Sequence, residues 1–445
     1  MVDTLSHLPP LPLVIDYQDA PLTVSAQDEL GISQVLQLHD RVRRATLRIP
    51  PASLHNILAL MDDSFPILEI LCFSSTAKEM DADLKLPTRF IAPNLRHLTL
   101  LGIGLPPGLP LLSSTVALVT LTLGNIRSSG YFPPKHLITR LRFLPQLEEL
   151  FISFSIPIPR PRAEGELLDA LTSVTLPALK RLTFRGVSAY LESLVAQLNA
   201  PVLEHLGITI FNQIAFTFPH LSHFTRMTAG LRLPFAAVVF ESDAVSVVMD
   251  QRRQHQGDAS PSFSFRVMCQ QFDWQVDCAA EICNALMPAL SAVDGLTLDL
   301  DRQRNPTEWQ DGAVDGATWR ELLGPFVGAR ELCICHALAW QLSFALEMDD
   351  AGLDPMLLPN LQVLVPRLEE DHHELENNAF GSFVDARQIA GRPVRVSPLP
   401  LRAQPVWPEH HNPPEADLGL HMRSTSRGWF RKAVIDRIRN RFGQR

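Results

Sequence analysis

The sequence predicts an α/β solenoid, a fold in which short parallel strands and helices alternate along one stacked array. Three observations lead to this prediction: a leucine pattern that recurs along the chain, helical periodicity between its copies, and a globular composition. Of the 445 residues, 46% are hydrophobic and 20% are charged, which excludes a largely disordered chain. One repeat alone buries too few apolar side chains to offset its conformational entropy, so its stability depends on stacked neighbours.

The repeated pattern combines a proline with regularly spaced apolar residues. It reads proline, any residue, leucine, two residues, leucine, one residue and an apolar residue, which contains the L-x-x-L-x-L core of a leucine-rich repeat. The last two apolar positions predict a short strand with both side chains on one face. Complete and partial copies begin at Arg43, Pro66, Pro93, Leu118, Pro145, Pro177, Pro201, Pro219, Val293, Glu331 and Pro359, of which the copy at Pro219 is a weaker one.

Helical periodicity separates these copies. Apolar residues recur every three or four positions in residues 54–61, 166–171 and 191–198, which predicts helices there. The leucine pattern fades between residues 230 and 290, and two interpretations stay open for that stretch: degenerate repeats or an insertion. The predicted architecture is therefore a curved array of short parallel strands with helices on its outer face and irregular repeats.

Composition divides the chain into four parts. Residues 1–39 form an N-terminal segment with one predicted helix, from Asp28 to His39. Residues 40–390 form the repeat array, residues 391–420 a proline-rich linker, and residues 421–445 a basic tail. The prolines favour an extended linker, because each fixes one backbone torsion angle.

The tail differs in charge from the rest of the chain. It holds eight Lys and Arg residues and one Asp, whereas the whole chain has a formal net charge of −9. Three interpretations stay open: a partly helical tail without a ligand, docking on an anionic membrane or a partner, and nucleic-acid contact, which is the least favoured. The candidate tail residues are Arg427, Arg431, Lys432, Arg437, Arg439 and Arg441.

Cysteine usage and targeting signals indicate a reducing, intracellular environment. The six cysteines include no C-x-x-C pair and have no regular disulfide spacing. No basic segment precedes an apolar stretch at the N-terminus, as it would in a signal peptide. No apolar run approaches the roughly 18 residues that a membrane-spanning helix needs. We therefore expect a cytoplasmic or nuclear location.

No segment carries the signature of a catalytic or cofactor site. Phosphate-loop, zinc-protease and nucleophile-elbow motifs are absent from the sequence. Residues 102–108 imitate a glycine-rich phosphate loop, but Pro106 and Pro107 lack the N–H donors that such a loop uses. Cys333 and Cys335 flank an inward Ile334 without an evident set of further ligands. We expect a non-enzymatic protein that uses neither a cofactor nor a metal.

The strands offer a more specific candidate site. In a leucine-rich solenoid they line the concave wall, so the residues between the inward leucines point into the concavity. Arginine and an exposed phenylalanine among them are common anchors of protein interfaces. The candidate partner-binding residues are Arg44, Arg48, His97, Thr99, Thr120, Thr122, Glu149, Phe151, Arg181, Arg185 and His205.

Several stretches resemble a known family. They begin at Asp40, Phe65, Ala92, Leu109, Leu144, Ile156, Leu182 and Leu296, and include Ala92-Pro-Asn-Leu-Arg-His-Leu and Leu144-Pro-Gln-Leu-Glu-Glu-Leu. Together they resemble the F-box/leucine-rich-repeat-like proteins of mushroom-forming (basidiomycete) fungi. The resemblance covers roughly residues 10–395, is most specific in residues 40–230, and does not extend to the basic tail.

The resemblance implies a role as the substrate receptor of an SCF-type ubiquitin ligase. In that family the F-box, an N-terminal helical module, binds the adaptor subunit and the repeats bind the target protein. Residues 1–40 depart from this plan because they are too short and too proline-rich for a complete F-box. The repeats therefore predict an unknown protein target, and an SCF adaptor is expected as a partner only if an F-box lies upstream. An orphan interaction scaffold and a peripheral membrane protein anchored by its tail are the alternatives.

Overall fold

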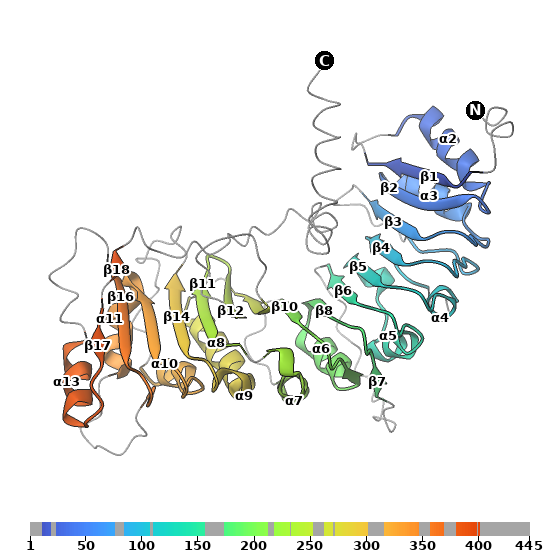
Figure 1. Cartoon of the computed structure of the whole chain (residues 1–445). Coiled ribbons are helices and arrows are strands. Elements are labelled where there is room, and N and C mark those ends of the chain that lie inside the picture. The colour runs from blue at the N-terminus through green and yellow to red at the C-terminus, as the bar shows by residue number, and fades with distance from the viewer. Residues whose placement is uncertain are drawn as a thin grey trace. The chain divides into compact units, whose positions relative to one another are not determined.

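The computed structural model describes most of the chain between residues 11 and 400 (Figure 1). It divides into two compact units, which we call unit 1, described within residues 11–155, and unit 2, described within residues 173–400. The described ranges are 11–18, 24–75, 84–106, 110–155, 173–211, 218–231, 233–251, 262–269, 272–300, 316–346, 357–368, 380–397 and 399–400. The sequence predicted one repeat array, whereas the backbone contacts separate it after residue 169.

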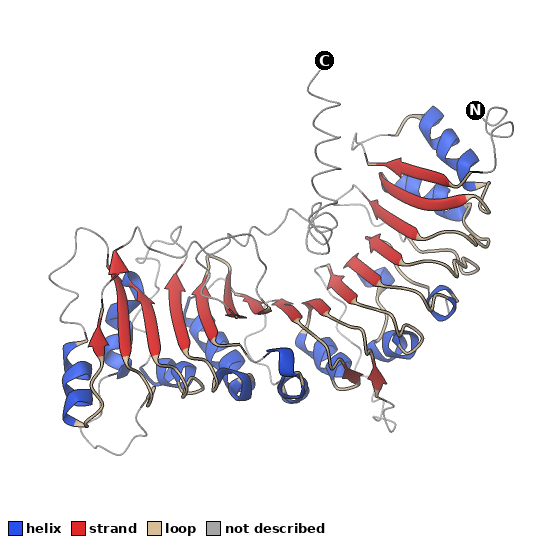
Figure 2. Ribbon diagram, in the orientation of Figure 1, coloured by secondary structure: helices blue, strands red, loops and turns tan. Residues whose placement is uncertain are grey.

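Unit 1 is a parallel sheet with helices on one face (Figure 2). Its neighbouring strands are β1 (Leu13–Tyr17), β2 (Val42–Ile49), β3 (Ile70–Ser75), β4 (His97–Leu101), β5 (Thr120–Ile126) and β6 (Glu149–Phe154). Its helices are α2 (Ala26–Leu36), α3 (Pro51–Ala59), α4 (Leu111–Ser114) and α5 (Pro134–Leu141), with a short 3-10 turn η1 (Ser128–Gly130). This arrangement confirms the predicted solenoid-like α/β fold.

The repeated leucines form the core of unit 1. The strand register aligns them in two rows that face the helices, and each has at most 1% of its surface exposed. Burial of each such side chain stabilises the fold by roughly 1.5–3 kcal/mol. The two rows are Leu71, Leu98, Leu121 and Leu150, then Phe73, Leu100, Leu123 and Ile152.

The proline of the repeat lies in a turn that precedes the strand. The leucine two residues after the proline closes this turn by donating its backbone N–H to the residue before the proline, as from Leu68 to Phe65 and from Leu95 to Ala92. Proline suits the position because its fixed torsion angle matches the first central residue of a β-turn. The proline and the first leucine therefore set where each strand begins.

Unit 2 continues the repeat architecture with a larger set of strands. In spatial order its main sheet contains β8 (Arg181–Gly186), β10 (His205–Phe211), β13 (Phe263–Met268), β12 (Ala244–Asp250), β11 (Phe235–Phe240), β14 (Gly295–Leu300), β15 (Glu331–Cys335), β16 (Val363–Leu368) and β17 (Arg395–Val396), and β18 (Leu399–Pro400) also pairs with β16. A small parallel sheet joins β7 (Val174–Thr175) to β9 (Leu198–Asn199). The helices are α6 (Ser188–Val195), α7 (Pro219–Met227), η2 (Ala229–Leu231, a 3-10 turn), α8 (Phe272–Ala285), α9 (Met287–Leu290), α10 (Gly316–Leu323), α11 (His336–Leu346) and α13 (Gly381–Ile389).

An antiparallel hairpin interrupts the parallel strands of unit 2. Strand β12 runs antiparallel to both β11 and β13, while β13 is parallel to β10 and β11 is parallel to β14. The chain thus passes from β10 to β11, returns through β12, and places β13 beside β10. This hairpin explains why the leucine pattern fades between residues 230 and 290. Of the two interpretations left open there, the structure favours an insertion over degenerate repeats.

Three sequence predictions need correction in the fold. The sheet begins at β1, before the predicted array boundary at residue 40, because Ile15 pairs in register with Ala45. The weak repeat copy at Pro219 is helix α7, since Leu221 and Phe224 are spaced for one buried helical face. Residues 395–396 and 399–400 of the predicted linker belong to strands β17 and β18.

The predicted helices agree more closely. The helix expected over residues 54–61 is α3, and the helix expected over residues 191–198 is α6, three residues earlier. The N-terminal helix expected from Asp28 is α2, where the Ser25 side chain caps the helix by accepting from the Asp28 N–H at 3.1 Å. The helix predicted over residues 166–171 lies outside the described residues, as do the linker beyond residue 400 and the basic tail.

Gly328 permits close backbone contact in the turn before β15. A Cβ at this position would lie 2.4 Å from the Ser291 carbonyl oxygen and 3.1 Å from that of Val293, so no side chain fits without backbone movement. Gly324 in the same connection has more room, with the nearest carbonyl oxygen 3.4 Å from its ideal Cβ.

We predict that Gly328→Ala lowers the free energy of unfolding by roughly 1–3 kcal/mol, because the methyl group forces two backbone segments apart. The matched variant Gly324→Ala changes it by about 0.5 kcal/mol or less. Urea unfolding of both variants measures the difference. Equal stability of the two variants would contradict the close contact at residue 328.

Candidate functional site

The helix-free face of unit 1 carries the first group of candidate residues. They alternate along the strands with the buried leucines, so their side chains point away from the helices. The register places Arg44, His97, Thr120 and Glu149 in one row, with Ile70 between the first two. All four candidates are half-buried, as are Arg48 and Thr99. The structure therefore brings the predicted residues of unit 1 together on one surface.

Two short contacts order polar groups on this face. The His97 Nδ1 and the Thr120 Oγ1 lie 3.2 Å apart across β4 and β5, and the Arg44 Nε donates to Thr46 Oγ1 at 3.3 Å within β2. The ring nitrogen is either donor or acceptor, according to the histidine tautomer. Both contacts hold polar side chains in place on the strand face.

Phe151 and Thr122 correct the predicted site. Both were expected as exposed partner-binding residues, yet Phe151 is 4% exposed and Thr122 is 2% exposed. The Phe151 ring reaches across Gly124, where an added Cβ would meet its Cε1 at 3.5 Å and the Leu101 side chain at 2.5 Å. Thr122 lies in register between Thr99 and Phe151. These side chains form a small apolar patch within the polar face and are not free anchors.

The helix-free face of unit 2 carries Arg181, Arg185 and His205. Arg181 and His205 are register partners on β8 and β10, and Arg185 is aligned with Thr209 four residues further along. The guanidinium of Arg185 lies 5.3 Å from the centre of the Phe211 ring, a cation–π contact. All three candidates are half-buried. Neighbouring strands of unit 2 thus align them on one face.

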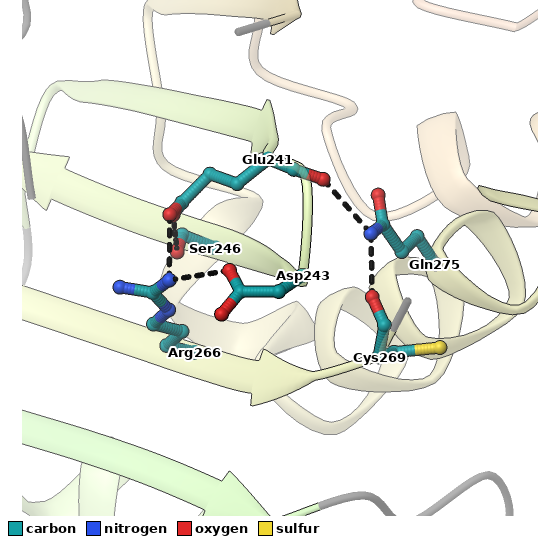
Figure 3. Close-up of polar contacts among 6 residues, drawn as sticks. All are labelled: Glu241, Asp243, Ser246, Arg266, Cys269 and Gln275. Atoms are coloured by element: carbon teal, nitrogen blue, oxygen red, sulfur yellow. Dashed lines mark hydrogen bonds and ion pairs between the residues drawn. The ribbon is translucent and has the colours of Figure 1, made fainter. Parts of the chain in front are cut away.

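Arg266 extends that row and is the charged group that sequence reasoning missed. It is aligned with Thr209 on β10 and with Ser246 on β12. Figure 3 shows its guanidinium between two carboxylates of the β11–β12 turn, 2.7 Å from Glu241 and 3.1 Å from Asp243. Ser246 also donates to Glu241 at 2.7 Å. The sequence did carry a signal for Arg266: apolar and polar residues alternate around it, which predicts a half-buried strand residue on the face opposite the core.

Gln275 ties the same turn to helix α8. Its Nε2 donates to the backbone oxygens of Glu241 at 3.0 Å and Cys269 at 2.6 Å, and its side chain is fully buried (Figure 3). The Cys269 backbone N–H donates to the Asp243 backbone oxygen at 2.7 Å. These bonds join the hairpin to β13 and α8. The cluster around Arg266 therefore forms a structural junction on the candidate face.

The thiols of helix α8 are held in their neutral form. A hydrogen bond with Cys269 and then burial raise the pKa of the Cys278 thiol, with smaller contributions from the negative charges of Asp277 and Glu281. Burial raises the pKa of the Cys283 thiol. Cys333 and Cys335 lie on the face opposite Leu332 and Ile334, as the sequence predicted; Cys333 is buried and Cys335 is half-buried. No group of three potential metal ligands occurs within the described ranges.

The tail residues Arg427, Arg431, Lys432, Arg437, Arg439 and Arg441 lie outside the described residues. Within the residues that the structure describes, no helix is both long enough and apolar enough to cross a membrane.

We predict that Arg266→Ala lowers the free energy of unfolding by about 3–5 kcal/mol, because it leaves the largely buried Glu241 carboxylate without its cation. Arg330→Ala is the control: Arg330 is 67% exposed and lies 3.8 Å from Asp294, so its loss changes stability by less than about 1 kcal/mol. Chemical denaturation compares the two. Similar losses in both would show that the Arg266 cluster adds nothing to the junction.

We further predict that Cys278 and Cys283 react with iodoacetamide more than about tenfold more slowly than Cys72 and Cys335 at neutral pH. Alkylation requires the thiolate, which burial disfavours, whereas Cys72 and Cys335 are half-buried. Timed alkylation followed by peptide mass spectrometry measures each rate, and denatured protein provides the control in which the four rates converge. Equal rates in the native protein would contradict the described burial.

Comparison with known proteins gives a structural likeness to a leucine-rich-repeat protein. No family model matches the chain, and no curated protein matches it. Among solved structures, the chain is similar to the leucine-rich repeat-containing protein LegL7 from Legionella pneumophila, with 11% sequence identity and a TM-score of 0.24. The match covers 84% of this chain and 97% of that chain.

Proposed function

We propose that this protein is a non-enzymatic interaction module that holds a partner protein on the helix-free faces of its strands. One observation carries the proposal: consecutive strands present half-buried polar and charged side chains on one face, while their other face is filled by leucine. In unit 1 the open face includes Arg44, Arg48 and His97, and in unit 2 it includes Arg181 and Arg185. Arginine is enriched at the anchor positions of protein interfaces.

Substrate recognition for an SCF-type ubiquitin ligase is the more specific form of this proposal. It rests on the resemblance of the repeat sequences to F-box/leucine-rich-repeat-like proteins, whose repeats bind the protein to be modified. The half-exposed polar rows in each unit are consistent with such a receptor. An interaction scaffold without ligase coupling uses the same faces and differs in lacking the adaptor.

Affinity capture with a matched control tests both forms. The test variant changes Arg44, Arg48, Arg181 and Arg185 to Ala. The control variant changes four exposed arginines outside these rows, Arg89, Arg96, Arg226 and Arg330, and so removes the same charge. We expect a partner recovered with the intact chain and with the control to fall at least about tenfold with the test variant, since each lost anchor costs about 1 kcal/mol or more.

Quantitative mass spectrometry of the captured proteins distinguishes the outcomes, provided that circular dichroism shows both variants folded. Equal recovery of every protein with both variants contradicts the proposed strand-face site. Recovery of a ligase adaptor subunit with the intact chain supports the receptor form. Capture of a strand-face partner without any adaptor supports the scaffold form instead.

A further inference from the structure

The helix-covered side of unit 1 carries a second charged feature that the strand faces do not include. From Leu84 to Leu147 the sequence holds seven Lys and Arg residues and no Asp or Glu, within a chain that has 48 acidic residues and a formal net charge of −9. Strands β4 and β5 and helices α4 and α5 come from this stretch. A region without carboxylates on an acidic protein creates a local positive potential.

Helix α5 concentrates this charge at the surface. Its apolar residues Leu137, Ile138 and Leu141 are buried against the sheet, which orients the remaining side chains outward. We define the α5 surface by the outward residues Lys135, His136, Arg140, Arg142 and Phe143. All of these are exposed except Arg140, which is half-buried. Helix α4, which packs beside α5, has no charged residue.

The cations of the α5 surface are not used by the fold. Lys135, Arg140 and Arg142 make no ion pair within the part of the chain that the structure describes, in contrast to Arg43, which pairs with Glu69 at 3.0 Å. The Arg142 guanidinium instead lies 5.5 Å from the centre of the Phe143 ring, and that residue is 40% exposed. A guanidinium group without an ion pair beside an exposed aromatic ring is typical of a protein-binding hot spot.

We propose that the α5 surface binds an acidic segment of a partner protein. The planar fork of Arg140 and Arg142 matches a carboxylate in two-bond geometry, and Phe143 offers a contact for one apolar side chain. Lys135 and Arg142 are seven residues apart, about 10 Å along the helix axis. In a polyproline II conformation, with three residues per turn and a rise of about 3.1 Å per residue, carboxylates three residues apart share one face and lie about 9 Å apart, so a Glu-x-x-Glu segment reaches both cations.

The small number of cations favours a protein over the other anionic macromolecules. Binding to anionic membranes or to nucleic acids depends on the count of neutralised charges, and three cations contribute only about 1 kcal/mol each at a lipid surface. Two-bond pairing of an arginine with a carboxylate, combined with one aromatic contact, draws its binding free energy more from geometry than from the number of charges. This site goes beyond the proposed strand-face function, because it lies on the helix-covered side and leaves the strand rows open.

Fluorescence anisotropy with a defined probe tests the proposal. The probe is a labelled twelve-residue peptide with Glu at every third position and one Leu, and the reference peptide has Gln in place of Glu. Titrations use the full chain and the variant Lys135→Glu/Arg142→Glu. The matched control, Arg226→Glu/Arg395→Glu, reverses two exposed cations of unit 2 and has the same net charge. Circular dichroism and thermal unfolding confirm that both variants are folded.

We expect the Glu peptide to bind the intact chain and the control equally, and the α5 variant at least about tenfold more weakly. Phe143→Ser should weaken binding of the Leu-containing peptide several-fold and leave a Leu-free Glu peptide unaffected. Equal losses in the α5 variant and the control overturn the proposal, as does equal binding of the Glu and Gln peptides. A third outcome also overturns the proposal: the intact chain binds phosphatidylserine vesicles or polyuridylic acid but no peptide, and the α5 variant loses that binding. The ligand of the α5 surface would then be the lipid or the nucleic acid.

Discussion

Alignment of leucines across consecutive parallel strands is the constraint on which the rest of the structure depends. One strand of five or six residues offers two inward side chains, too few to offset the entropy of ordering its repeat. In unit 1 the register places Leu98 directly between Leu71 and Leu121, so each leucine shares its apolar surroundings with two neighbours. The same register fixes which side chains remain on the opposite face. The same strand alignment therefore both forms the core and sets the positions of the polar rows.

This coupling explains both the uniformity of the core and the variety of the open face. Inward positions accept only side chains that fill the space between sheet and helices, which leads to repeated Leu, Ile and Phe. Outward positions have no such requirement, and arginine, histidine, threonine and glutamate alternate there. Phe151 is an exception on the open face, because Gly124 has no side chain and the Phe151 ring and the Leu101 side chain both lie close to the space that this leaves. A large apolar side chain on the open face is buried when its neighbour is small.

The hairpin of unit 2 shows how a repeat array accommodates inserted strands. Insertion of β11 and β12 beside β13 preserves parallel pairing on both outer sides, so the repeats from β14 onward continue without a reversal. The inserted turn carries two carboxylates toward the open face, and Arg266 neutralises part of that charge. Gln275 satisfies two backbone oxygens at the same junction. A polar junction of this kind defines one register for the hairpin, which its valine-rich strands alone do not specify.

The sequence by itself determined the fold class, the strand faces and the positions of three helices, α2, α3 and α6, because the signals for these are local. Leucines two residues apart define a strand face, and a proline two residues before a leucine defines the turn that precedes it. The sequence also placed nine of the eleven candidate partner-binding residues on surfaces where the structure leaves them half-buried. Only the tertiary structure decided that Phe151 and Thr122 are buried, that β1 belongs to the sheet, and that Arg266 faces Glu241. Each of these depends on a neighbour more than 20 residues away in the chain, or on the absence of a side chain at Gly124, and no local pattern encodes such pairings.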